Sequence, residues 1–188
     1  MQDRHDKDHL CAHTISQRPG FDVHVDRRDD KRNEDAMSCQ QGHLEGSYNF
    51  AETDRLVQAR HHLPIAGAFV LVLGSERPWV EASALGLGAT HITTVEYGGI
   101  TSTHPQIRTL TPHQIRARFH EFIEHFDVVI SYSSIEHSGL GRHGDALNPW
   151  GDRQAVARAW CMAKHGGRLA MGLPHNETDT NHYNAHHE

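Results

Sequence analysis

The chain has 188 residues, with 18 basic and 24 acidic side chains and a formal net charge of −6 when histidine is neutral. This length favours one domain of ordinary size. The acidic balance, without a concentrated basic face, argues against a dedicated nucleic-acid-binding protein. No stretch approaches the roughly 18 apolar residues that cross a bilayer, and the charged start MQDRHDKDHL is unlike a signal peptide. We therefore expect neither a nucleic acid nor a membrane as a partner.

The cysteines and histidines predict no metal site. Cys11, Cys39 and Cys161 are widely spaced and odd in number, so neither a disulfide framework nor a zinc finger is expected, and a cytoplasmic location is the default. The 19 histidines are compatible with metal binding, with pH sensing, or with composition alone. Pairs such as His61–His62 and His186–His187 fall in polar ends or on helix surfaces, so composition is the favoured interpretation.

Composition divides the chain near residue 46. Residues 1–46 hold mixed charges and few apolar side chains, which is typical of a disordered segment; an interaction tail is the alternative. Residues 47–175 have regular apolar patterning and form the predicted folded domain. Residues 176–188 form a polar C-terminal tail.

The first half of the predicted domain alternates helices and strands. A short helix over 51–62 comes first, and the apolar strand 68–73 then ends at Gly74. Pro78 suits the first position of the next helix. A second strand covers 92–95 and ends at Glu96.

The second half continues the same alternation. After a weak strand over 107–110, Thr111 and Pro112 begin a helix whose apolar stripe is Ile115, Phe119, Phe122, Ile123 and Phe126. A strand over 127–131 leads through a long loop to a helix that Asp152 caps. That helix is expected to turn inward Val156, Ala159, Trp160 and Ala163, with Cys161 as a buried, inert thiol. A final strand over 168–172 completes five, and the pattern predicts a parallel sheet with helices on both faces.

Ligands bind such a sheet beyond the carboxyl ends of its strands, so the loops there hold the candidate site. Gly74 allows a sharp turn after the first strand, although a lone glycine also suits any α/β turn. Glu96 lies 22 residues after Gly74, where a carboxylate accepts hydrogen bonds from two ribose hydroxyls; a solvated strand-end carboxylate is the less favoured alternative.

The most informative stretch runs from Asp127 to Asp152. It opens onto Glu136 and His137 and continues into a glycine-punctuated loop with the composition of an ordered binding loop. Glu136 and His137 could act as general acid and base. Adjacent side chains on an extended segment diverge, so one of the two is expected to face a ligand and the other to have a structural role.

Four segments together resemble a known family. VLVLGSERPW, TTVEYG, FDVVISYSSIEH and KHGGRLAMGLP are similar to the motif series of class I S-adenosylmethionine-dependent methyltransferases, over roughly Phe69 to Pro174. When the segment GLGRHGDALNPWGD and the C-terminal NAH are included, the sequence most resembles an uncharacterised group within that superfamily, the domain-of-unknown-function family DUF268. The resemblance implies a Rossmann-like three-layer α/β sandwich with a mostly parallel sheet, lacking the last strands of the methyltransferase type.

The resemblance also implies roles for individual residues. Those expected to bind S-adenosylmethionine are Gly74, Ser75, Glu96, Tyr97 and Ser133, and Glu136 and His137 are the expected catalytic residues. The sequence departs from the family at the glycine turn, which is reduced to Gly74, and at the usual acid after strand three, where Leu110 and Thr111 stand. Ser133 replaces the acid of metal-binding relatives, so no metal dependence is expected.

Two functions follow from these patterns. The first is S-adenosylmethionine binding with methyl transfer to an unidentified small-molecule or glycan acceptor. The second is a non-catalytic binding or scaffold protein that retains the fold and has lost the cofactor turn. Separately, the missing last strands are compatible with a truncated domain, a divergent gene product, or self-association that completes the sheet. A nicotinamide-dependent oxidoreductase requires G-x-G-x-x-G after the first strand, and that motif is absent.

Overall fold

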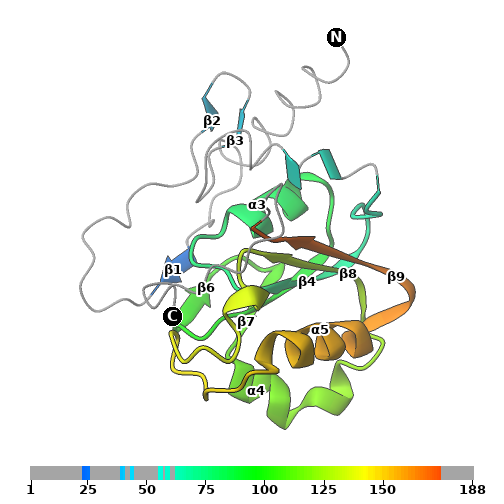
Figure 1. Cartoon of the computed structure of the whole chain (residues 1–188). Helices are drawn as coiled ribbons and strands as arrows, with labels where there is room; N and C mark the ends of the chain where they lie inside the picture. The colour runs from blue at the N-terminus through cyan, green and yellow to red at the C-terminus, as the bar shows by residue number, and fades with distance from the viewer. Residues whose placement is uncertain are drawn as a thin grey trace.

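Five parallel strands form the main sheet of the chain (Figure 1). The computed structural model describes residues 23–25, 39–40, 43–44, 55–56, 58–59 and 62–174. The strands are β4 (Phe69–Leu73), β5 (His91–Val95), β7 (Ile107–Leu110), β8 (Phe126–Tyr132) and β9 (Ala163–Gly172). The predicted parallel sheet of five strands is confirmed. Residues 175–188 lie outside the described part, so the lack of further strands stays a prediction.

The strand order is β7-β5-β4-β8-β9, with β4 in the centre. The chain builds outward from β4 through β5 to β7, then returns to the other side of β4 with β8 and β9. This is the Rossmann-like order, and its point of reversal lies between β4 and β8. Leu73 pairs with Val95 of β5 and with Ser131 of β8, so the loops after these three strands begin at one edge.

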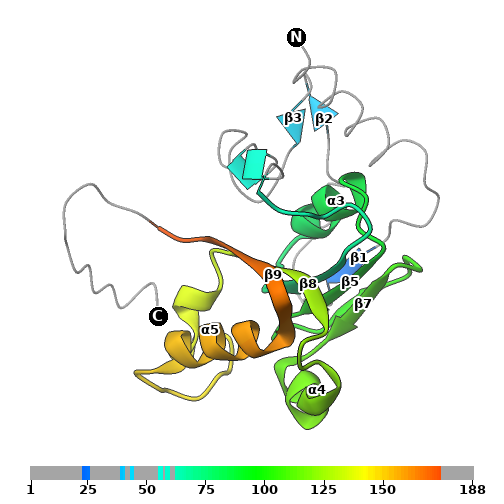
Figure 2. The ribbon, with the colours of Figure 1, turned by 90° about the vertical axis from the view of Figure 1, so that its right-hand side faces the viewer.

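Helices cover both faces of the sheet. Helix α3 (Trp79–Gly86) lies on one face, and α4 (Pro112–Ala117) and α5 (Gly151–Met162) lie on the other (Figures 1 and 2). Alternate residues of β4 serve the two cores: Val70 and Val72 pack with α3, whereas Leu71 packs with α4 and α5. The predicted Rossmann-like three-layer sandwich is confirmed.

The helix after β7 is shorter than its apolar stripe predicts. Thr111 caps α4 in a reciprocal capping box with Gln114, as its position suggests. A 3-10 turn, η2 (Phe119–Glu121), then follows, and the chain turns at Glu124, whose φ is 50°. Ile123 is consequently 52% exposed, and Phe126 belongs to β8.

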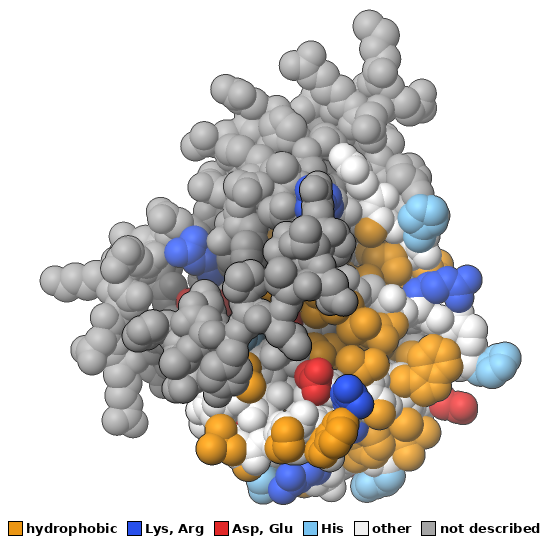
Figure 3. All heavy atoms as spheres, in the orientation of Figure 1, with side chains coloured by type: hydrophobic (Ala, Val, Ile, Leu, Met, Phe, Trp, Pro, Cys, Tyr) orange, Lys and Arg blue, Asp and Glu red, His pale blue; other side chains and the backbone are white. Residues whose placement is uncertain are grey.

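The inward face of α5 also differs from the prediction. Ala159 and Met162 are its buried residues, whereas Trp160 is 72% exposed and Cys161 is exposed, so the expectation of an inward Trp160 and a buried thiol is wrong. Trp150, not Asp152, occupies the N-cap position. Hydrophobic side chains gather on the surface over α5 and β9 (Figure 3).

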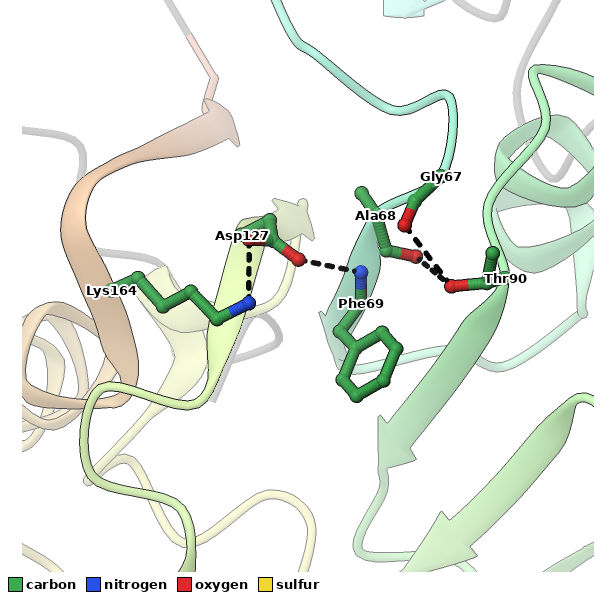
Figure 4. A network of polar contacts seen from close by, with 6 residues as sticks. All are labelled: Gly67, Ala68, Phe69, Thr90, Asp127 and Lys164. Carbon is green, nitrogen blue, oxygen red and sulfur yellow. Dashed lines mark hydrogen bonds and ion pairs between the residues drawn. The ribbon is translucent and has the colours of Figure 1, made fainter.

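Side chains tie the amino-terminal ends of the strands together (Figure 4). Asp127 at the start of β8 accepts a hydrogen bond from the backbone N–H of Phe69 at 2.9 Å and pairs with Lys164 of β9 at 2.7 Å. Burial acts to raise the pKa of Asp127, but these hydrogen bonds outweigh it and hold the pKa below 3.8. Thr90 Oγ1 lies within hydrogen-bond distance of the Gly67 and Ala68 carbonyls. This edge is structural.

Three short strands are described in the N-terminal segment predicted to be mostly disordered. β1 (Val23–Val25) pairs antiparallel with β6 (Ile100–Ser102), and β2 (Cys39–Gln40) pairs with β3 (His43–Leu44). The rest of residues 1–46 lies outside the described residues. In the predicted helix over 51–62, the described residues 55–56 and 58 are helical. Over the described part of the chain, no helix is long and apolar enough to cross a membrane.

Candidate functional site

The predicted site residues follow three neighbouring strands of the sheet. Gly74 and Ser75 follow β4, Glu96 and Tyr97 follow β5, and the loop after β8 supplies the others, namely Ser133, Glu136 and His137. Parallel strands end at one edge, so the fold gathers these residues beside the point of reversal. Direct contacts join some of them.

Glu96 is bonded to the turn after β4. Its Oε2 accepts a hydrogen bond from the backbone N–H of Ser75 at 2.7 Å, and its Oε1 accepts from the N–H groups of Tyr97 at 2.7 Å and Gly98 at 3.2 Å. The sequence predicts Glu96 and Ser75 in one site, but not that they bond to each other. A carboxylate has about four acceptor positions, so about one is left for a ligand.

Gly74 is required by its neighbour in the loop after β8. Its φ is 75°, and a Cβ built on it would lie 1.8 Å from Ser134 Oγ and 2.3 Å from Ser134 Cβ. Ser133, the preceding residue, has a φ of 48°, which is uncommon outside glycine. Backbone strain of this kind concentrates at functional sites. The short distances from Gly74 to Ser134 show that the turn after β4 and the loop after β8 are packed tightly against each other.

Glu136 and His137 lie in a short 3-10 helix, η3 (Ile135–His137), which Ile135 anchors in the core. The expectation of an extended segment with diverging side chains is wrong: His137 Nε2 is 3.9 Å from Glu136 Oε1. The Glu136 side chain is 21% exposed, yet both its carboxylate oxygens are buried without a hydrogen-bond partner among the described residues. The exposed part is therefore its hydrocarbon stem.

Ser131 adds a third oxygen of this kind. It lies near the carboxyl end of β8, is 1% exposed, and its Oγ has no hydrogen-bond partner within the described part of the chain. Buried polar atoms are nearly always hydrogen-bonded, since an unmade bond costs about 1–3 kcal/mol. The sequence gives no signal for Ser131, which is the residue before the last of β8.

The glycine-punctuated loop after η3 is closed on itself. The Gly139 N–H donates to Asp145 Oδ2 at 2.6 Å, and the Asn148 N–H donates to the Gly139 carbonyl at 2.8 Å. Burial acts to raise the pKa of Asp145, but hydrogen bonds from backbone N–H groups, that of Gly139 foremost, lower it below its ordinary value. These bonds give Asp145 a structural role in the loop, and ligand binding by the loop stays a prediction.

The two tryptophans that flank the edge differ. Trp79 is buried and meets the Tyr132 ring edge to face at 5.0 Å, so it belongs to the core. Trp150 is exposed, and the Arg153 guanidinium lies 4.7 Å from its ring centroid. Among the described residues, no group of three or more His, Cys, Asp or Glu side chains could hold a metal ion.

Glu81 is a buried carboxyl group beside the site that sequence reasoning missed. It lies in α3, is 2% exposed, and contacts Ser75 and Thr94 beneath the turn after β4. The sequence signal is a glutamate inside the run WVEASAL, in which every residue is buried. A charged residue type in such a run is rare without partners.

Several solved structures are similar to this chain. A proposed RNA methyltransferase from Pyrococcus horikoshii matches at 17% identity and a TM-score of 0.44, over 63% of this chain and 59% of that one. A proposed methyltransferase complexed with SAH matches at 13% identity and 0.44, over 65% and 35%. A proposed SAM-dependent methyltransferase from Streptococcus mutans matches at 15% identity and 0.43, over 64% and 33%. In each case the chain spans less than two thirds of the other protein's length.

Sequence comparison is more specific. No curated protein sequence is significantly similar to this chain. Residues 67–188 match a family described as "Caenorhabditis protein of unknown function, DUF268". The match begins just before β4 and includes every predicted site residue. The chain, which has a Rossmann-like fold, belongs to the DUF268 family.

Proposed function

We propose that the chain binds S-adenosylmethionine at the carboxyl edge of its sheet, where the carboxyl ends of β4, β5 and β8 lie side by side. We propose further that it transfers a methyl group to a small-molecule or glycan acceptor. The observation that supports this most is a set of three buried oxygens that have no hydrogen-bond partner among the described residues: Ser131 Oγ near the carboxyl end of β8, and the two carboxylate oxygens of Glu136 in η3. A ligand with hydrogen-bond donors at this edge would satisfy them. The motif resemblance supports S-adenosylmethionine as that ligand.

Glu96 would hold the ribose of the cofactor. Its carboxylate already accepts three backbone hydrogen bonds, so accepting two ribose hydroxyls requires the exchange of at least one of them. The bond from Ser75 is the one that joins separate loops. Its release would free the Ser75 N–H for the cofactor's own carboxylate, with Gly74 and Tyr97 beside it, so the donor set fits the cofactor after one exchange.

Bound S-adenosylmethionine would supply a methyl group activated by the positive sulfonium. Glu136 would act on the methyl acceptor, because its buried carboxylate oxygens can accept a proton from the acceptor or hold the acceptor's hydroxyl group in place. A carboxylate near a sulfonium is also electrostatically favourable. His137 lies close enough to orient Glu136, and Ser133 would contribute to the cofactor side of the site.

A non-catalytic binding or scaffold role is the second candidate. Two observations favour it: Ser75 and Glu96 satisfy each other, and Ser134 fills the space that Gly74 leaves. In this role the carboxyl edge would be a closed structural element, and the exposed hydrophobic side chains over α5 and β9 would be the interacting surface.

Calorimetric titration with S-adenosylmethionine and S-adenosylhomocysteine tests the proposal. We expect saturable binding to the wild type and about tenfold weaker binding to Glu96→Gln, equivalent to about 1.4 kcal/mol. The matched control Glu121→Gln changes an exposed carboxylate in η2, away from the site, and should bind as the wild type does. No binding to folded wild-type protein, or equal binding to Glu96→Gln, would contradict the proposal and favour the scaffold role.

A further inference from the structure

Glu81 is a buried carboxyl group that the proposed chemistry does not use. It lies in the first turn of α3, is 2% exposed, and is among the largest fully buried side chains of the described chain. A carboxylate in such a position costs several kcal/mol unless it is compensated. Its contacts show how the carboxyl group is accommodated.

Hydroxyl groups from two elements meet Glu81. Ser75 Oγ, in the turn after β4, lies 2.9 Å from Glu81 Oε2, and Thr94 Oγ1, on β5, lies 2.7 Å from Glu81 Oε1. Ser75 Oγ also lies 2.8 Å from the carbonyl oxygen of Arg77. Three hydrogen bonds are therefore within reach around one carboxyl group.

These three contacts need three hydrogens, and the two hydroxyls supply two. If Thr94 donates to Glu81 Oε1 and Ser75 donates to the Arg77 carbonyl, no hydroxyl hydrogen is left for the contact between Ser75 and Glu81. A proton on Glu81 Oε2 completes the set, because Ser75 Oγ can accept one hydrogen bond while it donates another. An ionised Glu81 would leave one contact as two facing acceptors.

We infer that Glu81 is a neutral carboxylic acid at neutral pH and that its proton, donated to Ser75 Oγ, positions the Ser75 turn. Ser75 in turn donates its backbone N–H to Glu96, so Glu81 acts on the proposed cofactor site through Ser75. It is a positioning residue rather than a catalytic one. This part of the inference rests on the proposed function; the protonation of Glu81 does not.

The electrostatic surroundings agree with a neutral acid. Burial raises the pKa of Glu81, while hydrogen bonding with Thr94, with the backbone N–H of Glu81 itself and with Ser75 opposes this in part. The charged group that acts on it among the described residues is Glu96, whose negative charge raises the pKa further. Ionisation of Glu81 would therefore break one hydrogen bond and set two like charges against each other across Ser75.

Carbon-detected NMR of the side-chain carboxyl groups tests the protonation directly. We expect the Glu81 signal, identified by its absence in Glu81→Gln, to keep its protonated position at neutral pH. Glu121 is an internal control because its pair with Arg118 lowers its pKa, so its signal should be that of an ionised carboxylate. A Glu81 signal at the ionised position at neutral pH would overturn the inference.

Binding of S-adenosylhomocysteine as a function of pH tests the positioning role. Glu81→Gln keeps one donor and one acceptor, so it should bind as the wild type does at neutral pH, whereas Glu81→Ala should bind about tenfold more weakly. Wild-type affinity should fall as pH rises through the raised pKa of Glu81, and Glu81→Gln should lack that fall. Parallel profiles for the wild type and Glu81→Gln would refute the role.

Stability separates the two proposals if the ligand does not bind. Because the folded pKa of Glu81 is raised above its ordinary value of 4.5, the folded chain holds a proton that the unfolded chain loses. The stability from Glu81 is therefore complete below pH 4.5 and is lost as pH rises through the folded pKa. The wild type should lose stability relative to Glu81→Gln over that range; a constant difference would contradict the inference even where the proposed function fails.

Discussion

Gly74 is the residue whose replacement tests the packing of the candidate site most simply. In Gly74→Ala, the added Cβ would lie 1.8 Å from Ser134 Oγ. The alanine backbone would also have to adopt a φ of 75°. We expect Gly74→Ala to lower the free energy of unfolding by about 1–2 kcal/mol for the backbone conformation and by about 1–3 kcal/mol more for the overlap. Denaturant unfolding measures the sum.

Two further variants separate these causes. Gly67 has a φ of 78° and nothing within 4 Å of an added Cβ, so Gly67→Ala should show the backbone cost alone. Adding Ser134→Gly to Gly74→Ala removes both overlapping atoms and leaves Ser134 Cα at 3.7 Å, an ordinary contact. The double variant should recover most of the additional loss. Equal losses for Gly74→Ala and Gly67→Ala would show that the two turns are not packed tightly.

The sequence predicts residues of this edge better than it predicts their contacts. Glu96 is foreseeable because an acid at the end of the second strand has a recognised chemical use. Its bond to the Ser75 N–H is not foreseeable, because it depends on how the turn after β4 bends toward β5. Ser134 and Glu81 act through packing between segments distant in sequence, which local patterns do not encode.

The sheet's amino-terminal edge is held by an interaction between elements. Asp127 of β8 joins Phe69 of β4 and Lys164 of β9. We expect Asp127→Ala to lower the free energy of unfolding at neutral pH by about 1–2 kcal/mol, since a backbone N–H and an ammonium lose their acceptor. Lys164→Met should cost less, about 1 kcal/mol at most, because the pair is partly exposed and the Phe69 bond remains. Urea unfolding of the three proteins compares them.

The pH dependence of this interaction has a definite sign. The folded pKa of Asp127 lies below its ordinary value of 3.8, so its contribution is present above that pH and is lost as pH falls through the folded pKa. The difference between the wild type and Asp127→Ala should therefore shrink in acid. A difference that stays constant from neutral pH to acid would rule out the charge as its cause.

The bounds of a single helix or strand were predictable where one local sequence pattern determines them. β7 covers the predicted residues 107–110, and Thr111 caps α4, since strand and capping signals are local. The inward face of α5 was not predictable, because few of its residues are apolar and a shift of one residue turns Trp160 to the surface. β9 begins directly at Ala163 and includes Gly166 and Gly167, at which the sequence predicts a break. Its register against β8 shifts between Phe126 and Val128.

For the whole molecule, alternation of strands and helices was enough to predict the class of fold. A parallel sheet follows because each connection returns the chain to the same end of the sheet, by a helix in every case except between β5 and β7. Ligand binding at the carboxyl edge follows from the reversal of strand order. This alternation did not predict the antiparallel pair of β1 and β6. The two strands are far apart in the sequence, and neither has a strong strand pattern. The proposed function thus depends on whether the carboxyl edge binds a ligand.

The most direct test is an amide proton–nitrogen correlation spectrum of the chain during titration with S-adenosylhomocysteine. The N–H groups of Ser75, Tyr97 and Gly98 all donate to Glu96, so ribose binding should shift their signals. The N–H of Phe69, bonded to Asp127 at the opposite edge, should not shift. Shifts confined to the three amides of the carboxyl edge and its loops are the predicted result; shifts centred on Phe69, or none at saturating ligand, would contradict the account.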